Sequence, residues 1–145
     1  PLGVLAEIGL FLVMHRITRY CTVRQIAIGA LLLTMLRWIL IAEVTDIVPV
    51  LIFAQLLHAA SYGALHVISV QYVQGFFGQH HHGQGQALYS GLTFGAGGAV
   101  GAWLSGFLVD GFDTSAAFWG GAAAMVFAVL ITWRWLQPPP EPTAT

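Results

Sequence analysis

The stretch VLIFAQLLHAASYGALHVISVQYV, residues 50–73, decides the fold of this chain. It is long and apolar enough to form a helix that crosses a lipid bilayer, which takes about 20 residues. Polar side chains interrupt it every three or four residues, at Gln55, His58, Tyr62, His66 and Ser69. At about 100° per residue, these five positions fall within an arc of about 80° on one helix face. The spacing predicts a membrane-spanning helix whose polar stripe faces the interior of a helix bundle.

The composition of the whole chain agrees with this class. Hydrophobic residues make up 57% of the 145 residues and charged residues only 8%, against roughly 25% charged residues in soluble domains. The net charge of -1 argues against nucleic-acid binding, which needs a basic face. The single cysteine excludes an internal disulfide and a paired-thiol metal or redox site. We therefore expect an all-α polytopic membrane helix bundle.

Five apolar segments follow one another along the chain. We expect five transmembrane helices at residues 2–14, 25–42, 49–74, 86–109 and 116–136, and a disordered Pro-rich cytoplasmic tail at 137–145. The stretch GFFGQHHHGQG, residues 75–85, is expected to be a loop. The first segment is shorter than the roughly 20 residues of a full span, and no targeting segment precedes it. We therefore expect the chain to be the C-terminal part of a longer protein.

The basic residues predict how these helices are oriented. Arg16, Arg19 and Arg24 lie between the first two segments, and Arg134 lies near the end of the last one. The loops expected on the other side, EVTD and DGFDTS, carry no Arg or Lys. Cytoplasmic loops of membrane proteins are enriched in these residues, so we expect the arginine end and the C-terminus to be cytoplasmic.

Glu7 and Arg37 are charged residues within predicted spans rather than at their ends. A charge at the bilayer centre costs roughly 2.5–3.5 kcal/mol on insertion scales, which favours a partner or a water-filled cavity. One interpretation is a proton-titratable or solute-binding carboxylate with Arg37 as its partner. The other is that Glu7 lies near a helix boundary and Arg37 reaches the interface. His58 and His66 similarly fit a proton relay or packed, hydrogen-bonded side chains.

Small residues recur at a fixed spacing in the fourth segment, which contains GLTFGAGGAVGAWLSG at residues 91–106. Gly91 and Gly95, Gly97 and Gly101, and Gly101 and Ser105 are each four residues apart. This spacing lets helix backbones approach closely in lipid. It predicts a helix–helix interface on this segment.

Three further chemical interpretations are weak. The tract His80, His81 and His82 has no carboxylate or thiol nearby, and consecutive residues point in different directions, so we expect no metal site and no cofactor. The Gly-x-Ser-Gly site of an intramembrane serine protease is absent. A haem with two histidine ligands needs them on facing helices, whereas His58 and His66 share one helix. We therefore expect no enzymatic activity.

Five stretches in this order carry a resemblance to a known family. They are GVLAEI at 3–8, HRITRY at 15–20, LRW at 36–38, QLLHAASYGALH at 55–66 and QGQALYSGLTFGAGGAVGAWLSGFLVD at 84–110. Together they resemble the C-terminal half of a major facilitator superfamily transporter, in the branch of phenylpropionate permeases and nucleoside–proton symporters. HRITRY resembles the Arg-rich cytoplasmic loop of that superfamily.

The resemblance implies that the five helices are the eighth to twelfth of a twelve-helix protein of the bacterial inner membrane. The N-terminal half would then be missing here, and because solutes bind between the two halves, this piece alone should not transport. It implies a pathway for protons and a small organic solute, an aromatic acid or nucleoside, with Glu7 as proton carrier. The residues that the resemblance implies for it are Glu7, Arg37, Gln55, His58 and His66, and we expect Tyr62 of the polar stripe to line it as well.

A second class of function also fits the sequence. The chain could be a non-transporting membrane scaffold or assembly subunit that docks a partner through its glycine-rich helix. A transporter predicts about six or seven further spans upstream, as the resemblance implies, whereas a scaffold does not.

Overall fold

The structure is a computed structural model that describes residues 16–44 and 46–137. Its elements in chain order are α2 (Val23–Glu43), α3 (Val48–Ser90), the π-helix η1 (Gly91–Gly97), α4 (Gly98–Gly111) and α5 (Thr114–Trp135). The described residues contain no strand. The first predicted span, 2–14, and residues 138–145 of the predicted tail lie outside them.

Four stretches of these helices are long and apolar enough to cross a membrane. They are Val23–Glu43, Val48–Phe77, His81–Gly111 and Thr114–Trp135. Buried helices of soluble proteins can also be apolar, but here most large apolar side chains of the described residues face outward. Such a surface is stable against lipid and not against water. The all-α membrane helix bundle is thus confirmed.

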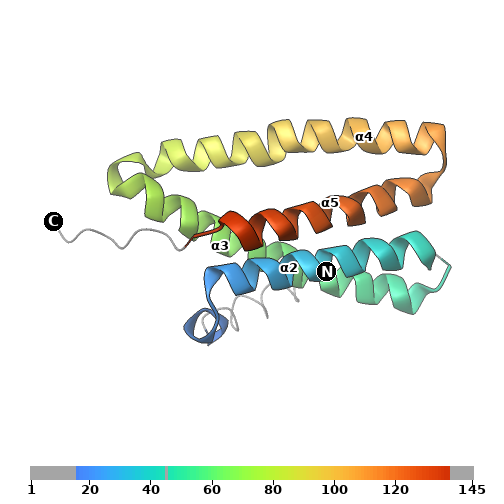
Figure 1. Ribbon diagram of the computed structural model, residues 1–145, viewed down its shortest axis with the longest axis horizontal. Helices are drawn as coiled ribbons and strands as arrows, with labels where there is room; N and C mark the ends of the chain where they lie inside the picture. Colours follow the sequence, from blue (N-terminus) through green and yellow to red (C-terminus); the bar gives the residue numbers. More distant parts are fainter. Residues whose placement is uncertain (1–15, 45, 138–145) are drawn as a thin grey trace.

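Helices α2 and α5 lie side by side and run in opposite directions (Figure 1). Hydrogen bonds join the pair at both ends. At one end, Arg24 Nε donates to the carbonyl oxygen of Leu136 over 2.8 Å. At the other end, Ser115 Oγ donates to the carbonyl oxygen of Ala42, also over 2.8 Å. These contacts set the register of α5 along α2.

The start of each of these two helices is encoded locally. Thr22 and Gln25 form a capping box on α2, in which each side chain bonds the backbone N–H of the other residue. The Asp113 side chain accepts a hydrogen bond from the N–H of Ala116, which caps α5. Such caps satisfy backbone donors that the first helical turn leaves unpaired.

Helix α2 also packs against α3, and small side chains make this contact close. Its core consists of Ile26, Ala27 and Ala30 from α2 with Ala64 and Ile68 from α3. Three of these five residues are alanines, and such small side chains let two helix backbones approach closely, which is how helices associate in lipid. Helix α2 therefore lies between α3 and α5 and holds the bundle together.

Two adjacent glycines on α5 let its neighbours approach from two directions. A Cβ on Gly121 would lie 3.3 Å from the Trp38 indole of α2, whose ring also lies 5.6 Å from that of Phe118. A Cβ on Gly120 would lie 2.6 Å from Leu108 Cδ1 of α4. The α5 backbone is thus the surface against which both α2 and the end of α4 pack.

The loop expected at residues 75–85 is helical instead, within α3. The chain nevertheless reverses direction there (Figure 1). A Cβ on Gly85 would lie 2.6 Å from the Phe77 ring and 3.0 Å from Val73 Cγ1. In a straight helix, 12 residues span about 18 Å, so this contact requires a sharp bend. Gly85 permits this contact, because its missing side chain leaves room for the Phe77 ring.

After the reversal, the chain forms a single long arm from α3 through η1 to α4. The sequence predicts a regular helix there, but Gly91–Gly97 form a π-helix. No residue of η1 or α4 is buried. Wider π turns occur mostly as short insertions in α-helices and often near functional sites.

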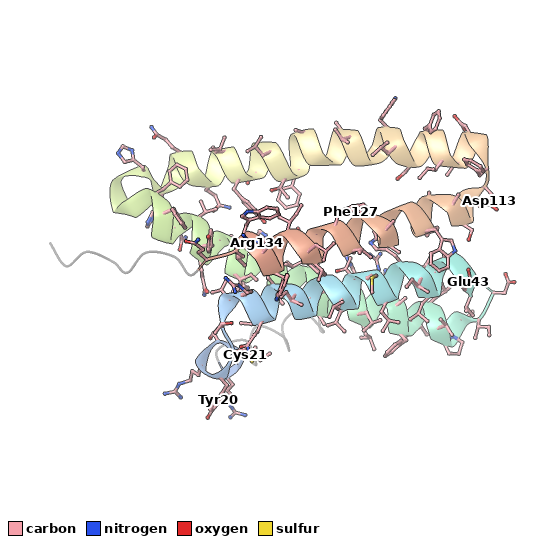
Figure 2. All side chains as sticks on the ribbon, viewed as in Figure 1. Tyr20, Cys21, Glu43, Asp113, Phe127 and Arg134 are labelled. Atoms are coloured by element: carbon pink, nitrogen blue, oxygen red, sulfur yellow. The ribbon has the colours of Figure 1, made fainter. Side chains whose placement is uncertain are left out.

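Charges separate to the two ends of the bundle. Figure 2 shows Arg134 toward one end and Glu43 and Asp113 at the other. The described acidic residues all lie at the second end, namely Glu43, Asp46, Asp110 and Asp113. Four of the five arginines lie at the first end, namely Arg16, Arg19, Arg24 and Arg134, leaving Arg37 between the ends.

Candidate functional site

The predicted polar stripe of α3 is a ladder of rings. The centroids of His58 and Tyr62 lie 5.5 Å apart, and those of Tyr62 and His66 lie 5.9 Å apart with nearly parallel planes. Residues four apart on a helix lie one above the other on the same face, which produces this stacking. The ladder therefore offers ring faces and ring nitrogens along one side of α3.

The ladder continues onto the returning arm. The Tyr89 ring lies 6.4 Å from His66, and Phe94, in η1, meets Tyr89 edge-on at 6.1 Å. The reversal near Gly85 brings these two residues back toward the α3 stripe. The five rings thus form one continuous row that starts on α3 and ends in the π-helix.

One ring atom in the row is unsatisfied. His66 Nδ1 is buried and has no hydrogen-bond partner among the described residues. Tyr62, beside it, is 43% exposed. Buried polar atoms are almost always paired, and an imidazole nitrogen either donates or accepts, depending on its tautomer. The ring row therefore combines an accessible aromatic face with a polar atom that lacks a partner.

The other predicted stripe residues differ in their surroundings. Gln55 is exposed, whereas Ser69 is half-buried and lines a cavity with residues of α2 and α5. The polar stripe thus has two parts: a ring row in the middle of α3 and, beyond it, a cavity near the arginine end.

Arg37 lies on α2 rather than in the ring row. Its guanidinium carbon lies 4.8 Å from the centroid of the Trp38 ring, a cation–π geometry. Its Nε is buried and unpaired within the described part of the chain. Ala27 of α2 and Ala64 of α3 pack in one core cluster, so they lie at about the same level in the bundle. The two helices are antiparallel there. Arg37, ten residues after Ala27, is therefore at about the level of Ala54, ten residues before Ala64. Arg37 is therefore near the Gln55 end of the stripe in depth. Glu7, its predicted partner, lies outside the described residues.

The sequence of this chain matches a known protein family. The model of the MFS_1 like family matches residues 1–119, most of the chain. The chain belongs to this family. The resemblance inferred from the separate motifs is thereby confirmed, and membership agrees with an integral membrane protein.

One curated relative is informative in detail. The chain is 28% identical over 107 residues to the Escherichia coli (strain K12) protein named "Probable 3-phenylpropionic acid transporter". The match covers 74% of this chain and 28% of the relative's length. No solved structure matches the chain.

The predicted glycine interface of this MFS_1 like chain is open. A Cβ added to Gly91, Gly95 or Gly101 would meet no described atom within 4 Å, and one on Gly97 would meet only the carbonyl oxygen of Leu92 in its own segment. Ser105 is exposed as well. Close packing through these residues stays a prediction, and its partner would be something other than the described helices.

The histidine tract is helical, within α3. His81 Nδ1 lies 3.2 Å from Gln84 Oε1, one turn away. Across residues 16–44 and 46–137, no group of three or more His, Cys, Asp or Glu side chains could hold a metal ion.

Tyr89 and Phe94 are the site residues that sequence reasoning missed. Neither lies on the α3 stripe. Tyr89 precedes the glycine run and Phe94 lies within it, and that run is interpreted as a helix-packing surface. The available signal was the combination of aromatic residues with a reversal: an antiparallel return after residue 85 brings position 89 back toward position 66.

Proposed function

We propose that this chain is part of a proton-coupled symporter for a small organic solute of the aromatic-acid or nucleoside class. The observation that carries the proposal is the ring row from His58 to Phe94 in a chain of a transporter family. The remainder of the transporter would be an N-terminal half that packs against this one. The relative's name, a probable 3-phenylpropionic acid transporter, supports an aromatic carboxylate as the first solute to test.

The chemistry of the row suits such a solute. Aromatic rings pair favourably with other rings in offset or edge-on geometry, at centroid distances of about 4.5–7 Å. Tyr62 and Tyr89 present such faces. When the rocking of the two halves uncovers it, the buried and unpaired Nδ1 of His66 would bond a carboxylate or hydroxyl of the solute. Arg37 supplies positive charge at about the depth of the Gln55 end of the stripe, which would favour an anionic solute.

Transport would follow from alternating access, in which two halves rock around a site at mid-membrane depth. Glu7 would carry the proton and Gln55, His58 and His66 would line the path. We place the arginine end in the cytoplasm, following the arginine bias of cytoplasmic loops, and the protein in a bacterial inner membrane with a cytoplasmic C-terminus.

The test is uptake of labelled 3-phenylpropionate by cells that express the longer protein containing this chain. Tyr89→Leu should lower uptake by about two- to tenfold, the equivalent of one ring pair. Phe127→Leu is the matched control, because Phe127 is an exposed aromatic residue of α5 that lies outside the row (Figure 2). Equal uptake by the two variants would remove Tyr89 from the pathway.

Proton coupling has its own experiment. With Glu7→Gln, accumulation driven by an inward pH gradient should be lost, while exchange of solute across the membrane at equal pH should persist. If pH-driven accumulation is unchanged, Glu7 is not the proton carrier.

One observation favours the scaffold as a second candidate. The glycine-rich face of η1 and α4 meets none of the described helices, which suits a docking surface for another protein. The uptake assay distinguishes the two functions. If the chain belongs to a scaffold, the longer protein will take up no solute even when it is folded and in the membrane.

A further inference from the structure

A cavity lies at the arginine end of the bundle, beyond the ring row. It has a volume of about 250 Å³ and lies among α2, α3 and α5, with Tyr89 at one wall. Its apolar lining is Val23, Ala27, Leu65, Ile68, Val73 and Leu136, and its hydroxyl-bearing lining is Ser69, Tyr72, Tyr89 and Thr132. None of the described charged side chains lines it.

The lining of this cavity suits a chain of methylenes better than an anionic solute, because it is largely apolar and holds no described charged side chain. Pockets for drug-sized ligands usually have volumes of about 300–1,000 Å³ and hold a few convergent polar groups. This cavity lies just below that range, and its polar groups are four hydroxyls, three on α3 and one on α5. In a bilayer, the flexible apolar molecule available at every helix surface is a lipid acyl chain.

The rim of the cavity carries positive charge. Arg24 donates its Nε–H to the carbonyl oxygen of Leu136, a residue of the cavity wall, and follows Val23, another wall residue. The Arg24 side chain is exposed, so its N–H groups that do not bond Leu136 remain available to a ligand at the cavity mouth. The described acidic residues all lie at the opposite end, so nothing on the described rim neutralises this charge.

We propose that the cavity between α2, α3 and α5 binds an anionic phospholipid. One acyl chain would enter the cavity, and Arg24 would hold the phosphate of the headgroup. Basic pockets between membrane helices select anionic headgroups, and a basic residue near the surface is worth about fivefold in affinity. The proposal is independent of solute transport and needs only the helices described here.

The test is lipid retention by the purified protein, measured by native mass spectrometry after reconstitution with phosphatidylcholine and phosphatidylglycerol at equal concentration. We expect phosphatidylglycerol to be retained preferentially. Arg24→Gln should lower its retention by about fivefold. Arg19→Gln is the matched control, because Arg19 is an exposed arginine of the same end that does not border the cavity.

Two further arms keep the proposal falsifiable. Thr132→Phe, which fills the cavity without changing charge, should lower retention of phosphatidylglycerol while circular dichroism reports a folded protein. Glycerophosphate, which has the phosphate but no acyl chain, should not compete at concentrations at which phosphatidylglycerol does. Equal retention of the two lipids, equal losses in Arg24→Gln and Arg19→Gln, an unaffected Thr132→Phe protein, or effective competition by glycerophosphate would each overturn the lipid site.

Discussion

The rings of Tyr62 and His66 stack on α3 with their centroids 5.9 Å apart and their planes 9° apart. Because the residues are one helical turn apart, the stack follows from the helix alone. The Nδ1 atom of the His66 imidazole in this stack is buried.

This relationship predicts a difference between two substitutions of Tyr62. Tyr62→Phe retains the ring and should keep solute uptake within about twofold of the unsubstituted protein. Tyr62→Leu removes the ring pair, worth about 0.5–1.5 kcal/mol, and should lower uptake by about two- to tenfold. Uptake assays on the longer protein measure both. If the two variants behave alike, the stacked ring has no role in solute binding.

Gly85 tests the chain reversal. Gly85→Val places methyl groups where the Phe77 ring lies, because even a Cβ would come within 2.6 Å of it. Overpacking of this kind typically costs about 1–3 kcal/mol, so the thermal midpoint in detergent should fall by several degrees. Gly83→Val is the control, since its Cβ would meet nothing within 4 Å. Equal midpoints for the two variants would show that residues 73–77 and 85 are not in contact.

Gly121 tests the packing of α2 on α5. Gly121→Leu must displace the Trp38 indole, a rigid ring held against Phe118, and should cost about 1–3 kcal/mol of stability. Gly120→Ala should cost less, although its Cβ would come closer to a neighbour. That neighbour is Leu108 Cδ1, the end of a flexible side chain. Thermal unfolding in detergent, followed by circular dichroism, checks the order of the two variants.

A substitution at Gly101 distinguishes the stability of this chain from its packing against another helix. Gly101→Leu should leave the unfolding midpoint of the chain unchanged, because its Cβ would meet nothing within 4 Å. In the longer protein, the same substitution should abolish uptake by blocking the close approach of another helix. Ala123→Leu, at an exposed position of α5, is the control of similar added size. Normal uptake by the Gly101→Leu protein would contradict docking through this face.

The sequence by itself determined the fold class, the placing of His58, Tyr62 and His66 on one helix face, and the separation of arginines from acidic residues. These follow from composition, from the helical repeat and from the order of segments, which are local or additive properties. The family followed as well, because its motifs stand in order along the chain.

Only the tertiary structure decided which residues contact the polar stripe of α3. Tyr89 and Phe94 join the ring row because the chain bends sharply near Gly85, and a bend within helical backbone leaves no clear signal in hydrophobic periodicity. The exposed glycine face of α4 and the cavity beneath Arg24 likewise depend on how α2 packs between α3 and α5. That packing is set by small residues such as Ala27 and Gly121, whose partners lie far away in the chain.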